Sequence, residues 1–131
     1  MIGVILASRG LIFAEAVDNL NRNLEGRDFR IYISHDLPIP DCQNVLAQRA
    51  LDDNCESLLF IEEDTVIPDK GLDALVALNS DIACIDYGVA GWGCVTRDSH
   101  TNEILWCGLG CTLIKREAFE AMERAAAWIL S

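Results

Sequence analysis

One stretch near the middle of the chain constrains the fold more than any other, because a short apolar run ends there in three consecutive acids. Four apolar residues, 58–61, are typical of a strand buried on both faces in the middle of a parallel sheet. Glu62, Glu63 and Asp64 follow directly. Neighbouring carboxylates repel one another, and they cannot be buried unpaired without a large desolvation cost. The stretch therefore predicts a central strand with a concentrated negative charge at its carboxyl end.

A bound cation would remove both the repulsion and the desolvation problem. Hard divalent ions such as Mg²⁺ and Mn²⁺ take oxygen ligands, often one or two carboxylates plus the phosphates of a substrate. Open α/β sheets bind ligands at the carboxyl ends of their strands. The acidic triplet thus indicates a site for a metal ion and a diphosphate. The alternative is a solvated acidic turn closed by Pro68, and the triplet alone does not decide between them.

The spacing of apolar residues and turn signals predicts alternating strands and helices. Pro38 and Pro40 are expected to keep their segment extended, with Asp41 as the N-cap of the following helix. The order predicts an α/β protein, a three-layer α/β/α sandwich with a mostly parallel central sheet and right-handed crossovers. The predicted strands are 1–7, 30–34, 57–61 and 81–85, and the predicted helices are 11–24, 42–53, one starting near Pro68 and one from Arg116.

The pattern becomes less regular after residue 86. Gly88, Gly91 and Gly93 lie close together, and two short apolar segments, 95–97 and 104–106, flank a polar loop. Such a pattern predicts a small antiparallel hairpin. Residues 108–114 are expected to form a further strand rich in small residues. No linker or repeat interrupts the sequence, so residues 1–131 are expected to form a single domain.

Charge and hydropathy exclude several classes of protein. The net charge is −11, with 21 acids against 10 bases, whereas a protein that binds the nucleic-acid backbone needs a basic surface. A nucleotide site remains compatible, because a metal ion screens the local charge. No apolar run approaches the ~20 residues of a membrane span, and the apolar N-terminus lacks the basic leader of a signal peptide. We therefore expect a cytoplasmic protein whose six cysteines are mostly reduced.

Further candidate residues follow the first two predicted strands. Ser8 and Arg9 lie in the loop before a helix, and a helix N-terminus favours an anion. Asp36 ends the second strand, where an acid is well placed to bond ribose hydroxyls or a base edge; the alternative is a simple turn with Pro38. Because parallel strands end at one edge of a sheet, these residues are expected to converge on the acidic triplet. That convergence favours a functional site.

Taken in order, these segments resemble the GT-A glycosyltransferases of the family-2-like nucleotide-diphospho-sugar transferase group. The first strand with Ser8, Arg9 and Gly10 resembles the opening nucleotide-binding loop. Residues 41–47 resemble the helix that carries an Arg-Asn pair in that family, and residues 59–68 resemble the strand that ends in an Asp-x-Asp motif. Residues 108–119 resemble the later Gly-rich strand and helix start on the acceptor side.

The resemblance implies a GT-A fold that binds a nucleotide-diphosphate sugar through Mn²⁺ or Mg²⁺. It implies that Asp64 binds the metal and that Glu62 contacts the metal or the ribose. The cation would act as a Lewis acid that stabilises the leaving diphosphate. Gly108 and Gly110 would lie on the acceptor side. The implied nucleotide-sugar-binding residues are Ser8, Arg9, Asp36, Asn44, Glu62 and Glu63.

Three departures from the family pattern keep other functions open. Glu62 stands in place of the first Asp, Gln43 stands in place of the Arg, and no equivalent of the late acidic base or histidine ligand precedes Ser131. The catalytic residue and the acceptor therefore remain unassigned. The alternatives are a nucleotidyltransferase-like enzyme and a non-catalytic interaction protein. The apolar end at residues 128–130 suggests a covering partner, such as a second copy in a homo-oligomer.

Overall fold

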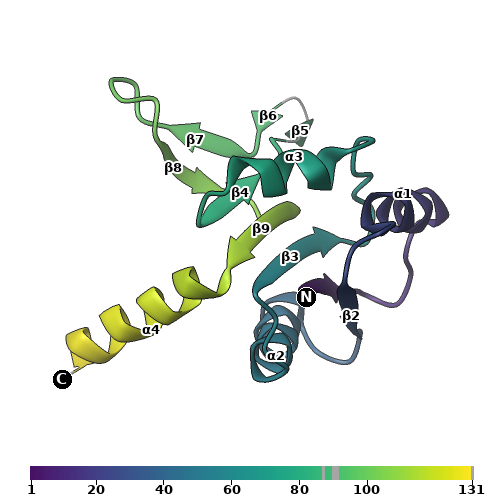
Figure 1. Ribbon diagram of the computed structural model, residues 1–131, viewed down its shortest axis with the longest axis horizontal. Helices are drawn as coiled ribbons and strands as arrows, with labels where there is room; N and C mark the ends of the chain where they lie inside the picture. Colours follow the sequence, from purple (N-terminus) through teal and green to yellow (C-terminus); the bar gives the residue numbers. More distant parts are fainter. Residues whose placement is uncertain (87, 90–91, 131) are drawn as a thin grey trace.

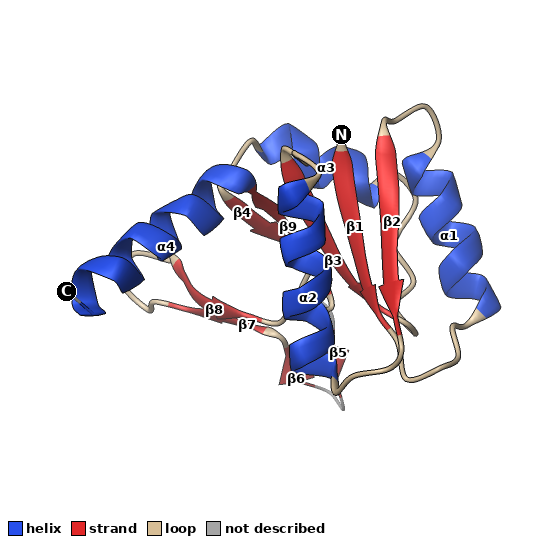
Figure 2. Ribbon diagram, turned by 90° about the horizontal axis from the view of Figure 1, so that it is seen from below, coloured by secondary structure: helices blue, strands red, loops and turns tan. Residues whose placement is uncertain are grey.

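A mixed β-sheet with helices on both faces forms the body of the protein (Figures 1 and 2). The computed structural model describes residues 1–86, 88–89 and 92–130, and it describes only the backbone of 88–89, 92 and 125–130. Within these ranges, five strands pair in the order β2-β1-β3-β9-β4. Their bounds are β1 Ile2–Ala7, β2 Phe29–Ser34, β3 Ser57–Glu62, β4 Ile82–Cys84 and β9 Cys111–Lys115.

The parallel half of the sheet agrees with the sequence prediction. Strand β1 pairs in parallel with both β2 and β3, and Ala7 lies opposite Ser34 on one side and Glu62 on the other. The segments that follow these three strands therefore lie at one edge. The apolar run at residues 58–61 is buried along its whole length, as expected of a central strand.

The other half of the sheet contradicts the predicted fold class. Strand β9 lies between β3 and β4 and is antiparallel to both, with Leu113 opposite Leu59 and Ala83. The sheet is therefore mixed, and β4 lies at its edge. The prediction of a three-layer α/β/α sandwich of the GT-A type with a mostly parallel sheet is wrong; the protein is a small mixed α/β domain. Apolar periodicity predicted the strand near 108–114 but carried no information about its neighbours.

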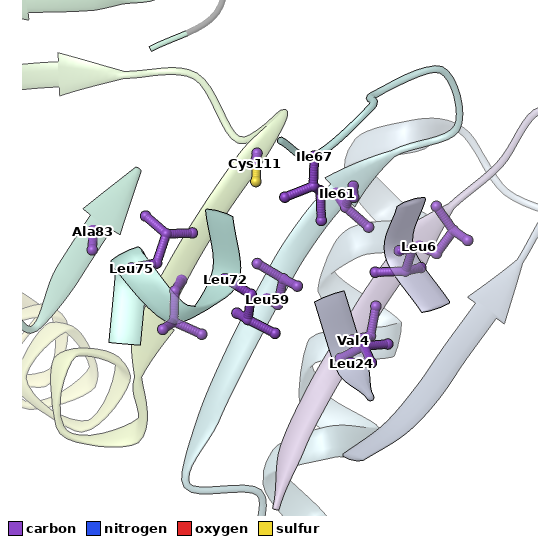
Figure 3. Close-up of a cluster of buried hydrophobic side chains, with 12 residues drawn as sticks. Val4, Leu6, Leu24, Leu59, Ile61, Ile67, Leu72, Leu75, Ala83 and Cys111 are labelled. Carbon is purple, nitrogen blue, oxygen red and sulfur yellow. The ribbon is translucent and has the colours of Figure 1, made fainter. Parts of the chain in front are cut away.

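The helices cover the sheet through two separate apolar clusters. Helices α1 (Ala14–Leu24) and α3 (Gly71–Leu78) pack on one face, where Figure 3 shows their leucines against β1, β3 and β9. Helix α2 (Ile39–Asp52) covers the other face. Helix α4 (Arg116–Leu130) lies on this face near its start, where Phe119 packs against Phe60 of β3, and the helix then projects away from the body (Figures 1 and 2).

Three helices begin at positions that differ from the predictions. Helix α3 begins at Gly71 rather than near Pro68. Helix α1 begins at Ala14 rather than residue 11, because the preceding Phe13 N–H donates to the carbonyl oxygen of Glu63 (3.1 Å). Helix α2 begins at Ile39, with Pro40 in its first turn. Proline is tolerated there, because the N–H that it lacks has no partner within a first turn. Asp41 is consequently inside the helix and does not form its N-cap.

Two short antiparallel strand pairs extend from the sheet. The predicted hairpin is present as β7 (Val95–Arg97) paired with β8 (Ile104–Cys107). A second pair joins β5 (Gly88–Val89) to β6 (Trp92–Gly93), while Gly91 of the predicted glycine cluster lies outside the described residues. The segment between β6 and β7 is attached to the sheet by the Asp86 carboxylate, which accepts the Cys94 N–H (3.0 Å).

A buried asparagine joins α1 to the start of α3. Asn23 Oδ1 accepts the N–H of Leu72 (3.0 Å), and its Nδ2 donates to the carbonyl oxygens of Asn19 (2.9 Å) and Pro68 (3.3 Å). The side chain thus provides a partner for a backbone N–H in the first turn of α3, where helical N–H groups lack partners within the helix. This polar contact within an apolar interface fixes the position of α3 relative to α1.

We expect Asn23→Ala to destabilise the protein by about 1–3 kcal/mol, because the substitution leaves the buried Leu72 N–H without its acceptor. Urea denaturation followed by circular dichroism measures this change. Asn21→Ala is the matched control, since Asn21 lies exposed on the same helix and its loss should change stability by less than about 0.5 kcal/mol. Equal effects of the two substitutions would contradict the assigned role of Asn23.

Candidate functional site

The acidic triplet borders a cavity of about 240 Å³ at the edge where β1 and β3 end. The residues after β1, the first turn of α2 and the end of β3 contribute its walls. Residues from three separate parts of the sequence therefore meet at the predicted position. The cavity is lined by Ala7, Arg9, Ile39, Gln43, Ile61, Glu62, Glu63 and Asp64.

Glu63 is held by the loop that follows β1. Its carboxylate accepts the backbone N–H of Arg9 (2.9 Å), the Nε–H of Arg9 (2.9 Å) and the hydroxyl of Ser8 (3.0 Å). The backbone and side-chain hydrogen bonds from Arg9 lower the pKa of Glu63, Ser8 adds to this effect, and desolvation opposes it. Glu63 therefore joins the ends of β1 and β3, as a structural member of the triplet.

The charge of Arg9 is directed mainly toward Glu63. Its pKa is raised, first by the hydrogen bond and charge of Glu63 and further by the nearby charges of Asp64 and Glu62. In the described part of the chain, no basic side chain forms an ion pair with Glu62 or Asp64. Both carboxylates line the cavity and are exposed to solvent. The edge therefore carries an excess of negative charge that favours a cation.

Of the two glycines predicted on the acceptor side, Gly110 approaches the same edge. The N–H of Glu62 donates to the carbonyl oxygen of Gly110 (3.3 Å), which extends the pairing of β3 with β9 by one residue. The carbonyl oxygen of Gly108 accepts the hydroxyl of the buried Thr112 (2.8 Å). The structure thus places Gly110 beside Glu62, and the hydrogen bond from Thr112 holds the backbone at Gly108, just before Gly110.

Two predicted residues lie away from the acidic cavity. Asp36 follows β2 in an exposed position, with its carboxylate 3.3 Å from Nδ1 of His35. Asn44 lines a different and larger hollow of about 610 Å³ between α2 and α4. Gln43, its neighbour in α2, lines the acidic cavity instead. Successive residues of a helix point about 100° apart, so the sequence motif selected the right turn of the helix but the wrong side chain.

The carboxylates at the cavity suit a metal ion only when a bound ligand supplies further oxygen atoms to it. Among the described residues, no group of three or more His, Cys, Asp and Glu side chains is arranged to hold a metal ion. Glu62 and Asp64 provide two carboxylates at one cavity. Mg²⁺ is commonly bound by one or two carboxylates together with waters and substrate phosphates. The residues present therefore fit a cation that arrives with a phosphate-bearing ligand.

Comparison with known proteins relates the chain to one solved fold. No protein-family model matches the sequence, and no curated protein matches it. The crystal structure of A197 from STIV is similar, with a TM-score of 0.63 and 24% sequence identity over 91% of this chain. The chain spans 66% of the length of A197. At this identity the likeness shows the fold alone, and it agrees with a small mixed α/β domain rather than the predicted sandwich.

The predicted absence of a membrane-spanning segment agrees with the structure: over the ranges that it describes, no helix is both long enough and apolar enough to cross a membrane. The cytoplasmic location stays a prediction. The apolar end at 128–130, where a homo-oligomer is predicted, lies outside the residues whose side chains are described. That contact stays a prediction as well.

We expect Glu63→Gln to lower the melting temperature at neutral pH, because a neutral amide makes weaker hydrogen bonds with Arg9 and Ser8. The folded pKa of Glu63 lies below its ordinary value of 4.5, so the ionised carboxylate stabilises the fold above that pH. This stabilisation is lost as the pH falls through the folded pKa. The difference in melting temperature between wild type and variant should therefore shrink in acid.

Thermal melts between about pH 3 and pH 7 measure this effect. Glu25→Gln is the control, since Glu25 is an exposed acid just beyond the end of α1. A difference between wild type and Glu63→Gln that stays constant over the whole range would contradict the assigned contribution of the ionised carboxylate.

Proposed function

We propose that this protein binds a nucleotide-diphosphate sugar together with Mn²⁺ or Mg²⁺ at the acidic cavity, and that it transfers the sugar to an acceptor. The observation that carries the proposal is the placement of Glu62 and Asp64 on one cavity at the end of β3. Arg9 lies at the same cavity but is directed mainly toward Glu63. A divalent cation would balance the remaining carboxylates and the diphosphate at the same time.

Each residue at the edge has a distinct role in this proposal. Asp64 and Glu62 would hold the cation, which when bound acts as a Lewis acid toward the diphosphate. Glu63 keeps Arg9 and the loop after β1 in place through its three hydrogen bonds. Ser8 is nearly completely buried and supports the same loop by accepting the Gly10 N–H (2.9 Å). The chain thus pre-organises the walls of the cavity before a ligand arrives.

The size of the cavity suggests how a donor would lie. Pockets that enclose a small-molecule ligand commonly measure about 300–1,000 Å³, and this cavity of about 240 Å³ is smaller. It suits the diphosphate and its cation, with the rest of the donor on the open rim. In this arrangement the nucleoside lies toward the end of β2, where Asp36 is exposed. The sugar lies toward Gly110, beside Glu62.

We expect a nucleoside diphosphate with Mn²⁺ to raise the melting temperature, whereas neither component alone has the same effect. A ligand present at 100 times its dissociation constant stabilises a protein by about 2.7 kcal/mol, which corresponds to a shift of several degrees. Asp64→Asn should abolish the shift. Asp69→Asn is the matched control, because it removes the same charge from an exposed residue a few positions further along that does not line the cavity.

The test uses UDP, GDP, ADP and CDP, their sugar conjugates and the corresponding triphosphates, each with Mn²⁺ or Mg²⁺. The absence of a metal-dependent shift with every ligand would refute the proposal. A preference for triphosphates would favour a nucleotidyltransferase. Binding of a radiolabelled sugar nucleotide without its hydrolysis or transfer would favour a non-catalytic binding protein.

A further inference from the structure

A second group of reactive side chains lies away from the acidic cavity, where the hairpin meets the edge strand of the sheet. Cys84 ends β4 and lies opposite Thr112 of β9, next to Cys111. Cys107 ends β8, and the N–H of the following Gly108 donates to the carbonyl oxygen of Cys94 (3.0 Å). Four of the six cysteines thus gather between the main sheet and the hairpin.

Two of these four cysteines line the same hollow at the junction. Cys84 and Cys107 line one hollow of about 290 Å³, together with Ile82 and residues 104–106. Besides burial, Cys107 is one of the neighbouring groups that raise the pKa of Cys84, which agrees with a position close to it. Both side chains are half-buried, whereas Cys94 and Cys111 are almost completely buried. A reagent in solution therefore reaches this pair and not the other two.

The arrangement suits a covalent link better than a metal site. No metal-holding group of three or more ligands exists among the described residues, which include all six cysteines. No disulfide joins any of them in this structure. We infer that Cys84 and Cys107 are a thiol pair that forms an intramolecular disulfide by exchange with a small-molecule disulfide such as oxidised glutathione.

The exchange has two balanced steps. One protein thiol loses its proton, and the thiolate attacks a glutathione sulfur, which forms a mixed disulfide and expels one glutathione thiolate. The second protein thiolate then attacks the protein sulfur of the mixed disulfide and expels the second glutathione thiolate. The two protein thiols lose two protons and two electrons, and oxidised glutathione takes up the electrons as two reduced glutathiones. No other oxidant is needed.

The bond would join β8 to the edge strand β4. Cys107 lies three residues before Gly110, and Gly110 lies beside Glu62. The link would therefore also restrain the segment that approaches the acidic cavity. Burial, followed by the charge and hydrogen bond of Cys107, raises the pKa of Cys84 to about 11. The thiolate is the attacking species, so the exchange should be slow near neutral pH and faster as the pH rises. The inference does not depend on the proposed function.

The full chain, reduced and then equilibrated with excess oxidised glutathione near pH 8.5, provides the test. After the protein is unfolded in a denaturant and its unreacted thiols are blocked with iodoacetamide, the intact mass should show four alkylated cysteines instead of the six present in the sequence. Cleavage after Lys70, Arg97 and Lys115 yields fragment 71–97, with Cys84 and Cys94, and fragment 98–115, with Cys107 and Cys111. These two fragments should be linked, and fragmentation spectra should place the bond between Cys84 and Cys107.

Single substitutions supply the controls. Cys84→Ser and Cys107→Ser should each abolish the linked fragments, whereas Cys42→Ser should not, because Cys42 is a buried residue of α2 on the other face of the sheet. Circular dichroism establishes that each variant is folded. Three outcomes would overturn the inference. They are a bond through Cys94 or Cys111, glutathione adducts without a protein disulfide, and six alkylated cysteines in the wild type after the same treatment.

Discussion

The insertion of β9 between β3 and β4 is the interaction on which the rest of the structure depends. A strand has backbone donors and acceptors on both sides, and β9 satisfies those of two neighbours that belong to earlier parts of the chain. The pairing continues past both ends of β4. The Ile85 N–H donates to the carbonyl oxygen of Cys111 (3.0 Å), and the Lys115 N–H donates to the carbonyl oxygen of Asp81 (2.9 Å). It also fixes where the hairpin leaves the sheet and where α4 starts. The mixed character of the sheet follows directly.

The same insertion places Gly110 beside the acidic edge. Strand β1 brings Ser8 and Arg9 to one side of the triplet, and β9 brings Gly110 to the other. The three acids therefore differ in their hydrogen-bond partners. All three acids line the cavity, but Glu63 accepts three hydrogen bonds from the loop after β1, while Glu62 and Asp64 are exposed and form no ion pair among the described residues. Strand β3 ends at Glu62, so Glu63 and Asp64 lie in the turn that follows, and the hydrogen bonds from Ser8 and Arg9 account for this division.

The fold also illustrates where polar groups are placed inside an apolar interface. Asn23 lies on the buried face of α1, although periodicity alone marks that face only by its apolar residues. Its amide is tolerated because the first turn of α3 supplies a matching donor, the Leu72 N–H. By contrast, Phe13 and Val17 belong to the apolar periodicity of the same segment and remain exposed. Phe13 has an extended backbone conformation just before Ala14, whereas Val17 lies within α1.

The sequence by itself determined the parallel half of the sheet and the edge at which Ser8, Arg9 and Glu62 meet, because buried strands and their polar ends leave a local signal. Only the tertiary structure decided that β9 is antiparallel and central, since periodicity records burial and not the strand beside it. It also decided that Gln43 rather than Asn44 lines the acidic cavity, and that Cys84 meets Cys107. The physical reason is common to all three: such contacts depend on how distant segments pack, which short-range patterns do not encode.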